Sequence, residues 1–427
     1  MSWKKSGIKK NTIGFGLIAL GSVLIIGVVA FFMINRYFEI RELKIEYQEE
    51  IDFYQKIGRH EQEWIAQMEL SNGAFPFCEE TNGTANIVPY FSDNAAIALL
   101  NDITEESYLD EVIAYMDWHL KHLNTANDDL YGVDGTIYDY TIIVKDGVVI
   151  EEISVGSYDS MDSYAATFIM LLWEYYENTG DENYLIKNRN DIFRIIRTMA
   201  GTIDEDGLSI VKDGYPIKYL MDNTEVNMGL KDAIFLLEKV YLNESQKDTQ
   251  NYEEALELKT DLEELLTKNT IQIDELLWND SEQRYEVGLN NNSQIITFKG
   301  WDQFYPDAVL QLFPIIYEID SIEDEQAKFL YAKFSNQYDW QNFGHFKNDD
   351  ASFYWPLLAY AGAMMEDEVR VKTYILNYQN TLMKEHAYPV YISDAAWIVR
   401  SCNKMINHYE RKMLRIDPFG LVKTSKD

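Results

Sequence analysis

Hydrophobic residues recur at helical spacing over most of this 427-residue chain, and two kinds of helical segment alternate. One kind carries charges on one face and apolar residues on the other, as half-exposed helices do. The other kind opens on a polar or acidic stretch and continues with Ala and large apolar residues. The first kind covers residues 37–68, 108–123, 184–200, 252–277, 325–336 and 369–384, and the second kind begins near residues 88, 158, 221, 300, 348 and 388.

The alternation occurs six times and predicts six helical hairpins. Each apolar segment needs partners that bury it on all sides, and a repeated hairpin supplies them by stacking its neighbours. A closed ring with the apolar helices inside and the half-exposed helices outside meets that need. The pattern therefore predicts one all-α domain.

Two stretches with a period of two interrupt the helices. "TIYDYTIIVKDGVVIEEISV", from Thr136, alternates and contains a Lys-Asp-Gly turn, so it predicts a β-hairpin. "QRYEVGLNNNSQIITF", from Gln283, predicts a second hairpin. Each stretch comes shortly before the opening of an apolar segment, and we expect the wall of a cleft there.

Three of the openings, "DSMDSYAATF", "GWDQFYPDAV" and "AYPVYISDAAW", resemble the six-hairpin glycosidase superfamily when they are set in this alternation. The resemblance extends over nearly everything after about Glu46 and identifies no particular hydrolase family. It implies an (α/α)6 toroid over residues 46–412 with a C-terminal tail at 413–427. It also implies a groove where the inner helices begin, lined by carboxylates and aromatic rings, that cleaves glycosidic bonds.

The stretch "GSYDSMDSYAATF", from Gly156, holds more acid than a helix start requires, because a helix cap needs one oxygen. Two carboxyls in one funnel would acquire different pKa values, which suits a reaction that needs one proton donor and one carboxylate. The alternative is that Asp159 and Asp162 form a cap and its companion. The candidate catalytic residues are Asp159, Asp162, Asp302 and Glu225.

Aromatic and acidic residues gather in the same openings and form the candidate substrate-binding set. Flat rings with polar edges suit pyranose sugars, although large aromatic residues also dominate protein cores. We expect the single acids Asp93 and Asp394 to be helix caps. The substrate-binding candidates are Tyr158, Tyr164, Asp222, Trp301, Tyr305, Asp307, Asp350, Tyr354 and Trp355.

Charge and missing motifs exclude several other functions. A formal net charge of −34 argues against nucleic acid as a partner, because phosphate binding relies on Lys and Arg. No GxGxxG, P-loop, GxSxG or HExxH pattern occurs, so we expect no cofactor, no esterase elbow and no metal site, with calcium held among carboxylates as the alternative. His119 and His122 are expected to be a solvated pair. Cys78 and Cys402, the only cysteines, are expected to be unpaired, with one bridge as the alternative.

The N-terminus differs from the rest of the chain. Four lysines within residues 1–12 precede an uncharged apolar run at 13–34, which is long enough to span a bilayer as a helix, and 35–45 reads as a stalk. The positive-inside rule then places the basic tail in the cytoplasm and the toroid outside. A cleaved signal peptide is the alternative, but the run lacks a small-x-small cleavage site.

Two functions fit these observations. The first is a membrane-anchored, extracytoplasmic glycoside hydrolase that acts on a cell-surface or extracellular polysaccharide or oligosaccharide. The second is a non-catalytic glycan-binding protein on the same toroid, a partner of envelope or exopolysaccharide assembly machinery. A uronate lyase is disfavoured, because it would need cations near the substrate acid and the openings contain almost none.

Overall fold

The structure is a computed structural model that describes residues 7–101, 103, 107–243, 250–348 and 350–424, and the side chains from residue 26 onward within them except that of residue 250. The chain divides into two compact units. One consists of Met1–Tyr54 with Ile406–Asp427, and the other of Gln55–Met405. Helices α1 (Gly7–Gln67) and α14 (Ile392–Ile416) each contribute residues to both units.

The smaller unit pairs the first helix with the end of the last. Lys44 Nζ donates a 2.8 Å hydrogen bond to the carbonyl of Val422, and the rings of Tyr47 and Tyr409 lie 5.8 Å apart. A search of the described residues finds no helix of sufficient length and apolarity to cross a membrane. The side chains of the predicted basic tail, 1–12, and of the first part of the predicted span, 13–25, lie outside those described.

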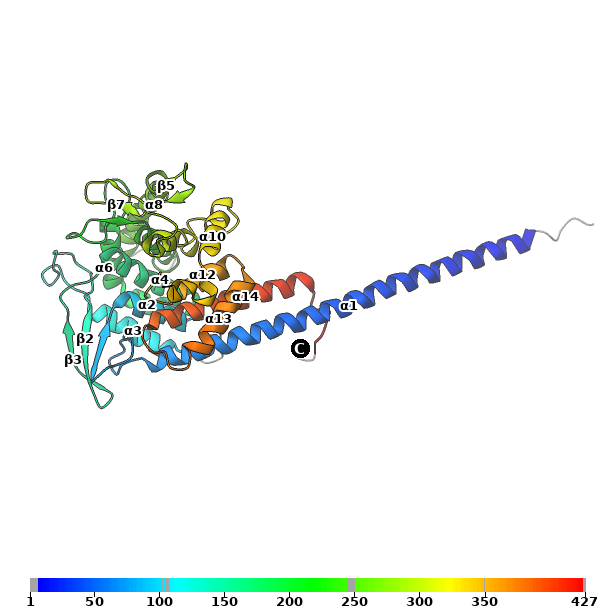
Figure 1. The fold of residues 1–427 in the computed structure, drawn as a ribbon, viewed down its shortest axis with the longest axis horizontal. Coiled ribbons are helices and arrows are strands. Elements are labelled where there is room, and N and C mark those ends of the chain that lie inside the picture. Colours follow the sequence, from blue (N-terminus) through cyan, green and yellow to red (C-terminus); the bar gives the residue numbers. More distant parts are fainter. Residues whose placement is uncertain (1–6, 102, 104–106, 244–249, 349, 425–427) are drawn as a thin grey trace, which may run out of the picture. The chain divides into compact units, whose positions relative to one another are not determined.

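The larger unit follows the predicted alternation of outer and inner helices, coloured in chain order in Figure 1. Most of the predicted segments begin within a few residues of the observed helices. The outer helices are the end of α1, α3 (Leu109–Lys121), α5 (Glu182–Lys187) with α6 (Arg189–Gly201), α8 (Gln250–Gln272), α10 (Glu325–Gln337) and α13 (Glu368–Thr381). The inner helices are α2 (Pro89–Leu99), α4 (Met161–Thr179), α7 (Leu220–Leu236), α9 (Phe313–Ile316), α12 (Leu357–Met364) and α14.

The inner helices form a closed ring. Helix α4 packs between α2 and α7, and α9 packs against both α7 and α12. The ring from α12 to α14 continues through Tyr360 and Trp397, whose centroids are 5.2 Å apart. Arg400 on α14 completes it by donating a 3.4 Å hydrogen bond to Asn94 on α2. This arrangement confirms the predicted helical toroid, and it explains the all-round apolarity of segments such as α4.

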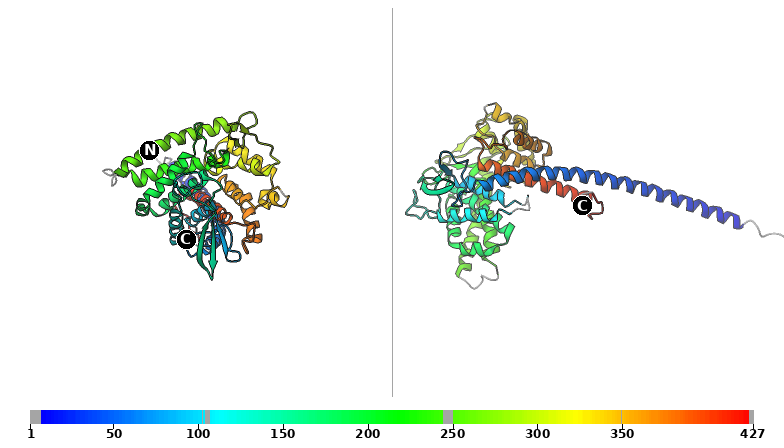
Figure 2. Two further views of the ribbon diagram at one scale, coloured as in Figure 1. Left: turned by 90° about the vertical axis from the view of Figure 1, so that its left-hand side faces the viewer. Right: turned by 90° about the horizontal axis from the view of Figure 1, so that it is seen from below.

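Both predicted β-insertions are present. Strands β1 (Thr84–Ile87), β2 (Tyr140–Lys145) and β3 (Val148–Ser154) form one antiparallel sheet, and Asp146 and Gly147 turn the β2–β3 hairpin with positive φ angles of 51° and 75°. In the left-hand view of Figure 2 this hairpin and α8 lie at opposite sides of the ribbon.

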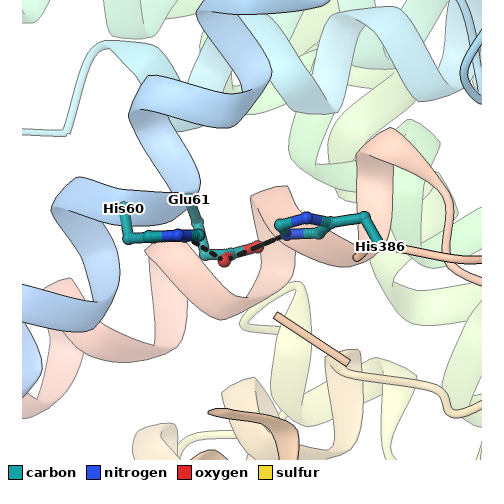
Figure 3. A group of neighbouring side chains, drawn as sticks. All are labelled: His60, Glu61 and His386. Carbon is teal, nitrogen blue, oxygen red and sulfur yellow. Dashed lines mark hydrogen bonds and ion pairs between the residues drawn. The ribbon is translucent and has the colours of Figure 1, made fainter. Parts of the chain in front are cut away.

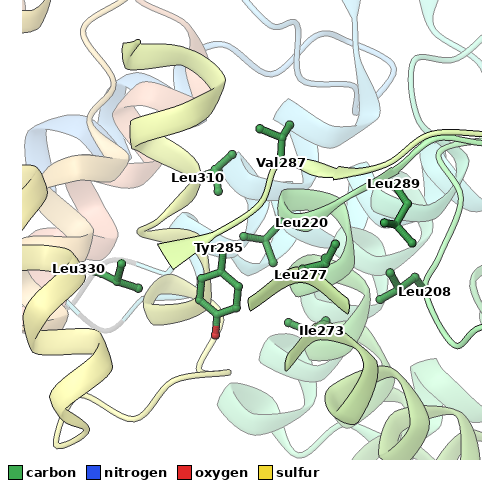
Figure 4. Packing of buried hydrophobic residues seen from close by; sticks show 9 residues of the cluster. All are labelled: Leu208, Leu220, Ile273, Leu277, Tyr285, Val287, Leu289, Leu310 and Leu330. Atoms are coloured by element: carbon green, nitrogen blue, oxygen red, sulfur yellow. The ribbon is translucent and has the colours of Figure 1, made fainter. Parts of the chain in front are cut away.

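The second insertion is smaller than predicted and supports a local core. Strand β7 (Gly288–Leu289) pairs with β8 (Ile295–Ile296) and with β4 (Lys218–Tyr219). Strands β5 (Trp278–Asn279) and β6 (Arg284–Tyr285) form a separate pair. Gly288 is required at its place, because a Cβ there would lie 2.2 Å from the Lys218 carbonyl oxygen. Figure 4 shows the cluster beneath, which consists of Leu208, Leu220, Ile273, Leu277, Tyr285, Val287, Leu289, Leu310 and Leu330.

Two local expectations were wrong. The apolar segment from residue 300 is not one helix: a π-turn at Phe304–Ala308 is followed by the short α9, which has Pro314 in its first turn, where the missing N–H is tolerated. His119 is buried rather than solvated, with its ring stacked on Phe168 at 3.7 Å, because this face of α3 packs inward. The prediction for the cysteines agrees with the described structure, in which Cys78 and Cys402 are free thiols.

Candidate active site

A cavity of about 760 Å³ lies where the inner helices begin. Its size is that of a small-ligand pocket. The residues around it come from all parts of the ring, although they are far apart in the sequence. The wall includes the acids Asp139, Asp159, Asp222, Glu225, Asp350 and Asp394 and the aromatic residues Phe77, Tyr90, Phe91, Tyr164, Tyr305, Phe313, Tyr317, Phe353, Trp355, Tyr391 and Trp397.

The opening of α4 separates its two aspartates. Ser160, rather than either acid, is the N-cap, and its hydroxyl accepts a 3.2 Å hydrogen bond from the Ser163 amide. Asp159 comes just before the cap and is therefore exposed to the cavity. Asp162 is fully buried, and its carboxylate accepts hydrogen bonds from the hydroxyls of Ser160 at 2.5 Å and Ser209 at 2.8 Å and from the Ser163 amide at 2.9 Å.

Asp162 is therefore not in the position that the catalytic prediction requires. Its oxygens serve its own helix start and a neighbouring loop, and it does not line the cavity. The two aspartates of this stretch have different roles. One aspartate supports the helix start, and the other is presented to the cavity because Ser160 does the capping.

Helix α7 brings two acids to the cavity on its first two turns. Asp222 and Glu225 are three residues apart and so lie on the same face of the helix. Glu225 Oε1 accepts hydrogen bonds from the hydroxyl of Tyr90 at 2.7 Å and from that of Tyr317 at 3.1 Å. These tyrosines come from α2 and from the residue that follows α9, so two other hairpins hold the Glu225 side chain in place.

Burial raises the pKa values of both acids. Loss of solvation, reinforced by the charge of Asp162, raises the pKa of Glu225 to about 7, although the hydroxyl donors act in the opposite direction. The pKa of Asp222 is raised well above its usual value, first by burial and then by the neighbouring charges of Asp162, Glu225 and Asp159. A carboxyl that holds a proton near neutral pH is suited to be a general acid.

Asp139 is an acid that the sequence analysis missed. It lies immediately before β2 and accepts a 3.0 Å hydrogen bond from the hydroxyl of Tyr164 on α4. Burial raises its pKa to about 6, and the charge of Asp159 acts in the same direction. Its position in the predicted hairpin segment, where a cleft wall was expected, was the available signal.

The segment before α9 contributes one aromatic ring and no acid. Tyr305 is exposed to the cavity, and its ring lies 5.3 Å from that of Trp355 at an angle of 35°. Asp307 is buried, and its carboxylate accepts a hydrogen bond from the Lys299 amide. Asp302 is exposed, but it is not among the residues that line the cavity. The expectation that Asp302 supplies a second catalytic carboxylate therefore disagrees with the geometry.

Three predicted aromatic contacts belong to the packing instead. Tyr158 is buried and stacks on Tyr138 at 5.7 Å. Trp301 packs against the cluster of Figure 4, with Lys333 Nζ 4.7 Å from its ring centroid. Tyr354 stacks on Phe346 at 4.2 Å. Their rings bury apolar area, which is the alternative role that the sequence analysis left open for them.

The structure thus brings seven of the predicted site residues to one cavity and leaves six outside it. Those at the cavity are Asp159, Glu225, Tyr164, Asp222, Tyr305, Asp350 and Trp355. Those outside it are Asp162, Asp302, Tyr158, Trp301, Asp307 and Tyr354. Asp394, expected only as a cap, accepts a 2.9 Å hydrogen bond from the Tyr391 amide and also lines the cavity, and burial raises its pKa to about 7.

The charge of the cavity wall has one sign. Six acids line it, and within the described part of the chain no lysine or arginine is among the lining residues. A wall of this kind repels anionic ligands and accepts neutral or cationic ones. A grouping of side chains with the spacing of a metal site, His60, Glu61 and His386, contains none of the cavity residues.

Similar folds occur among solved glycosidase structures. No family model and no curated protein matches this sequence. A wild-type glycosidase matches with a TM-score of 0.51 and 11% identity, over 86% of this chain and 98% of the other. An α-amylase from Clostridium perfringens matches with a TM-score of 0.52 and 10% identity, over 82% and 97%. The chain shares its helical fold with these glycosidase structures. At these identities the likeness establishes the architecture and leaves the chemistry to the cavity itself.

Proposed function

We propose that this protein is a glycoside hydrolase and that the cavity at the start of α4 and α7 is its active site. The observation that supports this most directly is the pair of carboxyls that different hairpins present to one cavity. Glu225 is buried with a pKa of about 7, whereas Asp159 is exposed to the cavity. Glycoside hydrolysis needs two carboxyl groups at one site, one that donates a proton and one that activates water or attacks the anomeric carbon.

In the proposed reaction Glu225 gives its proton to the glycosidic oxygen as the bond to the anomeric carbon breaks. Asp159 acts on the opposite side of that carbon, either by accepting a proton from the attacking water or by attacking the carbon itself. The net change is the addition of one water across the bond. Tyr90 and Tyr317 orient the Glu225 carboxyl by their hydrogen bonds, and Glu225 still lines the cavity.

The remaining wall residues favour an uncharged or cationic sugar. Tyr305 and Trp355 lie side by side and offer flat faces on which a pyranose ring can stack. The acids around them would repel a uronate, and the described wall offers no cation to neutralise one. Glucose is bound by one glycosidase of similar fold, with a TM-score of 0.50 and 11% identity, which supports a neutral hexose as the first substrate to test.

The test is a hydrolysis screen of the full chain on neutral, amino-sugar and uronate-containing glycans, beside Glu225→Gln. We expect hydrolysis of a neutral or amino-sugar glycan, and a 10²–10⁴-fold loss in the variant, because general acid catalysis typically contributes that much. A variant as active as the parent would overturn the assignment of Glu225. Glycan binding without any hydrolysis would favour the glycan-binding alternative, in which the toroid serves envelope or exopolysaccharide assembly.

We also propose that residues 13–34 anchor the protein in the cell membrane, with residues 1–12 in the cytoplasm and the toroid outside. The support comes from the sequence: four lysines precede an uncharged apolar run, and acidic residues follow it. Protease added to intact cells should then degrade the region after residue 37. Recovery of that region undigested, or of the protein in the soluble fraction after lysis, would contradict the proposal.

A further inference from the structure

Two histidines and a glutamate meet between the first outer helix and the loop that leads into the last inner helix. His60 and Glu61 lie on α1, and His386 lies between α13 and α14. Glu61 Oε2 is 2.9 Å and Oε1 is 3.1 Å from His386 Nε2, and Oε1 is 3.2 Å from His60 Nδ1. Figure 3 shows the three side chains pointing toward one another, with Glu61 in the middle.

The carboxylate of Glu61 is buried, and its ionic partners among the described residues are histidines. It is 0% exposed, and within the described residues its ion pairs are with the two histidines, not with a lysine or arginine. Tyr378 adds a neutral 2.9 Å hydrogen bond to Oε2. A charge excluded from water in this way is costly unless an opposite charge compensates it.

The surroundings of His386 and His60 hold the two imidazoles in positions where they could bind a cation. The ring of His386 is stacked on that of Trp64, with centroids 4.0 Å apart and planes at 9°, which fixes its orientation. The backbone of His386 has a φ of 43°, a conformation that a non-glycine residue adopts at a cost. The His60 side chain is 45% exposed, so that solvent has access to one edge of the group.

We propose that His60 Nδ1, Glu61 and His386 Nε2 form a binding site for a divalent transition metal, with Zn²⁺ as the best match. These ligand atoms lie within 4.8 Å of one another. Two imidazoles and one carboxylate form a known set of zinc ligands, and the exposed edge at His60 leaves a fourth position for water. Tyr378 orients the Glu61 carboxylate from behind, as an outer-shell hydrogen bond does in metal sites.

The site would join the first hairpin of the toroid to the last. It ties the end of α1 to the loop before α14, and Tyr391, Ser393 and Asp394 at the start of α14 belong to the cavity wall. The sequence motifs could not reveal this group, because His386 is more than three hundred residues from its partners. The metal would therefore steady one wall of the cavity from behind, and its binding can be tested without an enzyme assay.

The experiment uses the full chain, freed of metal by a chelator and then titrated with Zn²⁺ in a calorimeter. Co²⁺ serves as a second probe, because its visible spectrum reports tetrahedral nitrogen and oxygen ligands. We expect one Zn²⁺ per chain, a rise in the melting temperature with Zn²⁺, and an affinity at least 10-fold lower in His60→Ala and in His386→Ala. Tyr378→Phe should lose less, because it removes only the outer-shell bond.

The matched control is His122→Ala, which removes another histidine that pairs with a carboxylate, that of Glu152. It should keep the Zn²⁺ affinity and the melting shift of the parent. If His386→Ala fails to fold, His60→Ala still decides the question, because His60 lies at the surface. A parent chain that does not bind Zn²⁺ at one per chain, or a His60→Ala variant that binds as tightly as the parent, would overturn the proposal.

Discussion

The opening of α4 and the segment before α9 each carry two aspartates beside aromatic residues, but they supply different groups to the cavity. At α4, Asp162 is taken up by its own helix start, and Asp159 reaches the cavity. Before α9, Asp307 binds the Lys299 amide, and Asp302 lies away from the cavity in a turn closed by Gln303 N and Gly300 O at 3.0 Å. In each pair one aspartate accepts a hydrogen bond from a nearby backbone amide. The position of the other aspartate depends on the path of the chain that leads into the helix.

The largest effect expected from this difference is on catalysis. Asp159→Asn should lower hydrolysis by 10²–10⁴-fold, because the amide can neither attack nor accept a proton. Asp302→Asn makes the same chemical change in the other segment and should leave the rate within about two-fold, because the residue does not line the cavity. The measurement is kcat/KM for both variants on the best glycan of the screen. Equal losses in the two variants would mean that both segments reach the substrate.

The pH profile should show the same division. Because burial raises the pKa of Glu225 to about 7, its protonated form is lost as the pH rises through that value. The rate of a reaction that uses it as general acid should therefore fall about ten-fold for each pH unit well above 7. Glu225→Gln should remove this limb from its residual activity, and Asp302→Asn should keep it. A rate that stays constant from pH 7 to pH 9 would contradict the role given to Glu225.

The two acids before α9 should differ in their effect on stability. Asp307→Ala should lower the free energy of unfolding by about 1–3 kcal/mol, because the hydrogen bond between its buried carboxylate and the Lys299 amide is lost. Asp302→Ala should change it by no more than about 0.5 kcal/mol, as is usual for an exposed side chain. Urea unfolding of both variants checks this. A larger loss in Asp302→Ala would show that its turn contributes more than its exposure suggests.

The comparison also shows what the sequence could predict. Alternating helical segments predicted the hairpins well, because burial of an apolar helix on all sides leaves its mark along the whole segment, as in α4. The acids were harder to place, since a carboxylate near a helix start has the same sequence context whether it binds an amide or lines a cavity. Glu225 could be named as a candidate, but its tyrosine partners come from α2 and from beyond α9, and only the folded ring brings them together.

Asp139 and His119 also show that the sequence does not predict which elements pack against each other. Asp139 lies in a hairpin segment that was correctly predicted, but its contact with Tyr164 depends on how that hairpin meets α4. His119 is on a half-exposed helix, and the sequence favoured a solvated side chain, whereas in the fold it stacks on Phe168. Period and composition identify the faces of an element. They do not specify which neighbour a face meets.

Asp162→Asn is expected to have only a small effect on stability and on the rate of hydrolysis. The side chain keeps one oxygen for the Ser163 amide, and the Ser209 hydroxyl can rotate to accept a hydrogen bond from the new amide. Burial raises the pKa of Asp162 to about 6, so the buried ionised carboxylate costs stability in the folded state, and its replacement by a neutral amide should cost no more than about 1 kcal/mol. Hydrolysis should survive. Since the charge of Asp162 helps to raise the pKa of Glu225, the alkaline limb of the pH profile should move to lower pH, whereas Asp302→Asn should leave it in place. A stable Asp162→Asn variant whose hydrolysis is lower by orders of magnitude would show that Asp162 takes part in catalysis. It would contradict the separate roles given to Asp159 and Asp162.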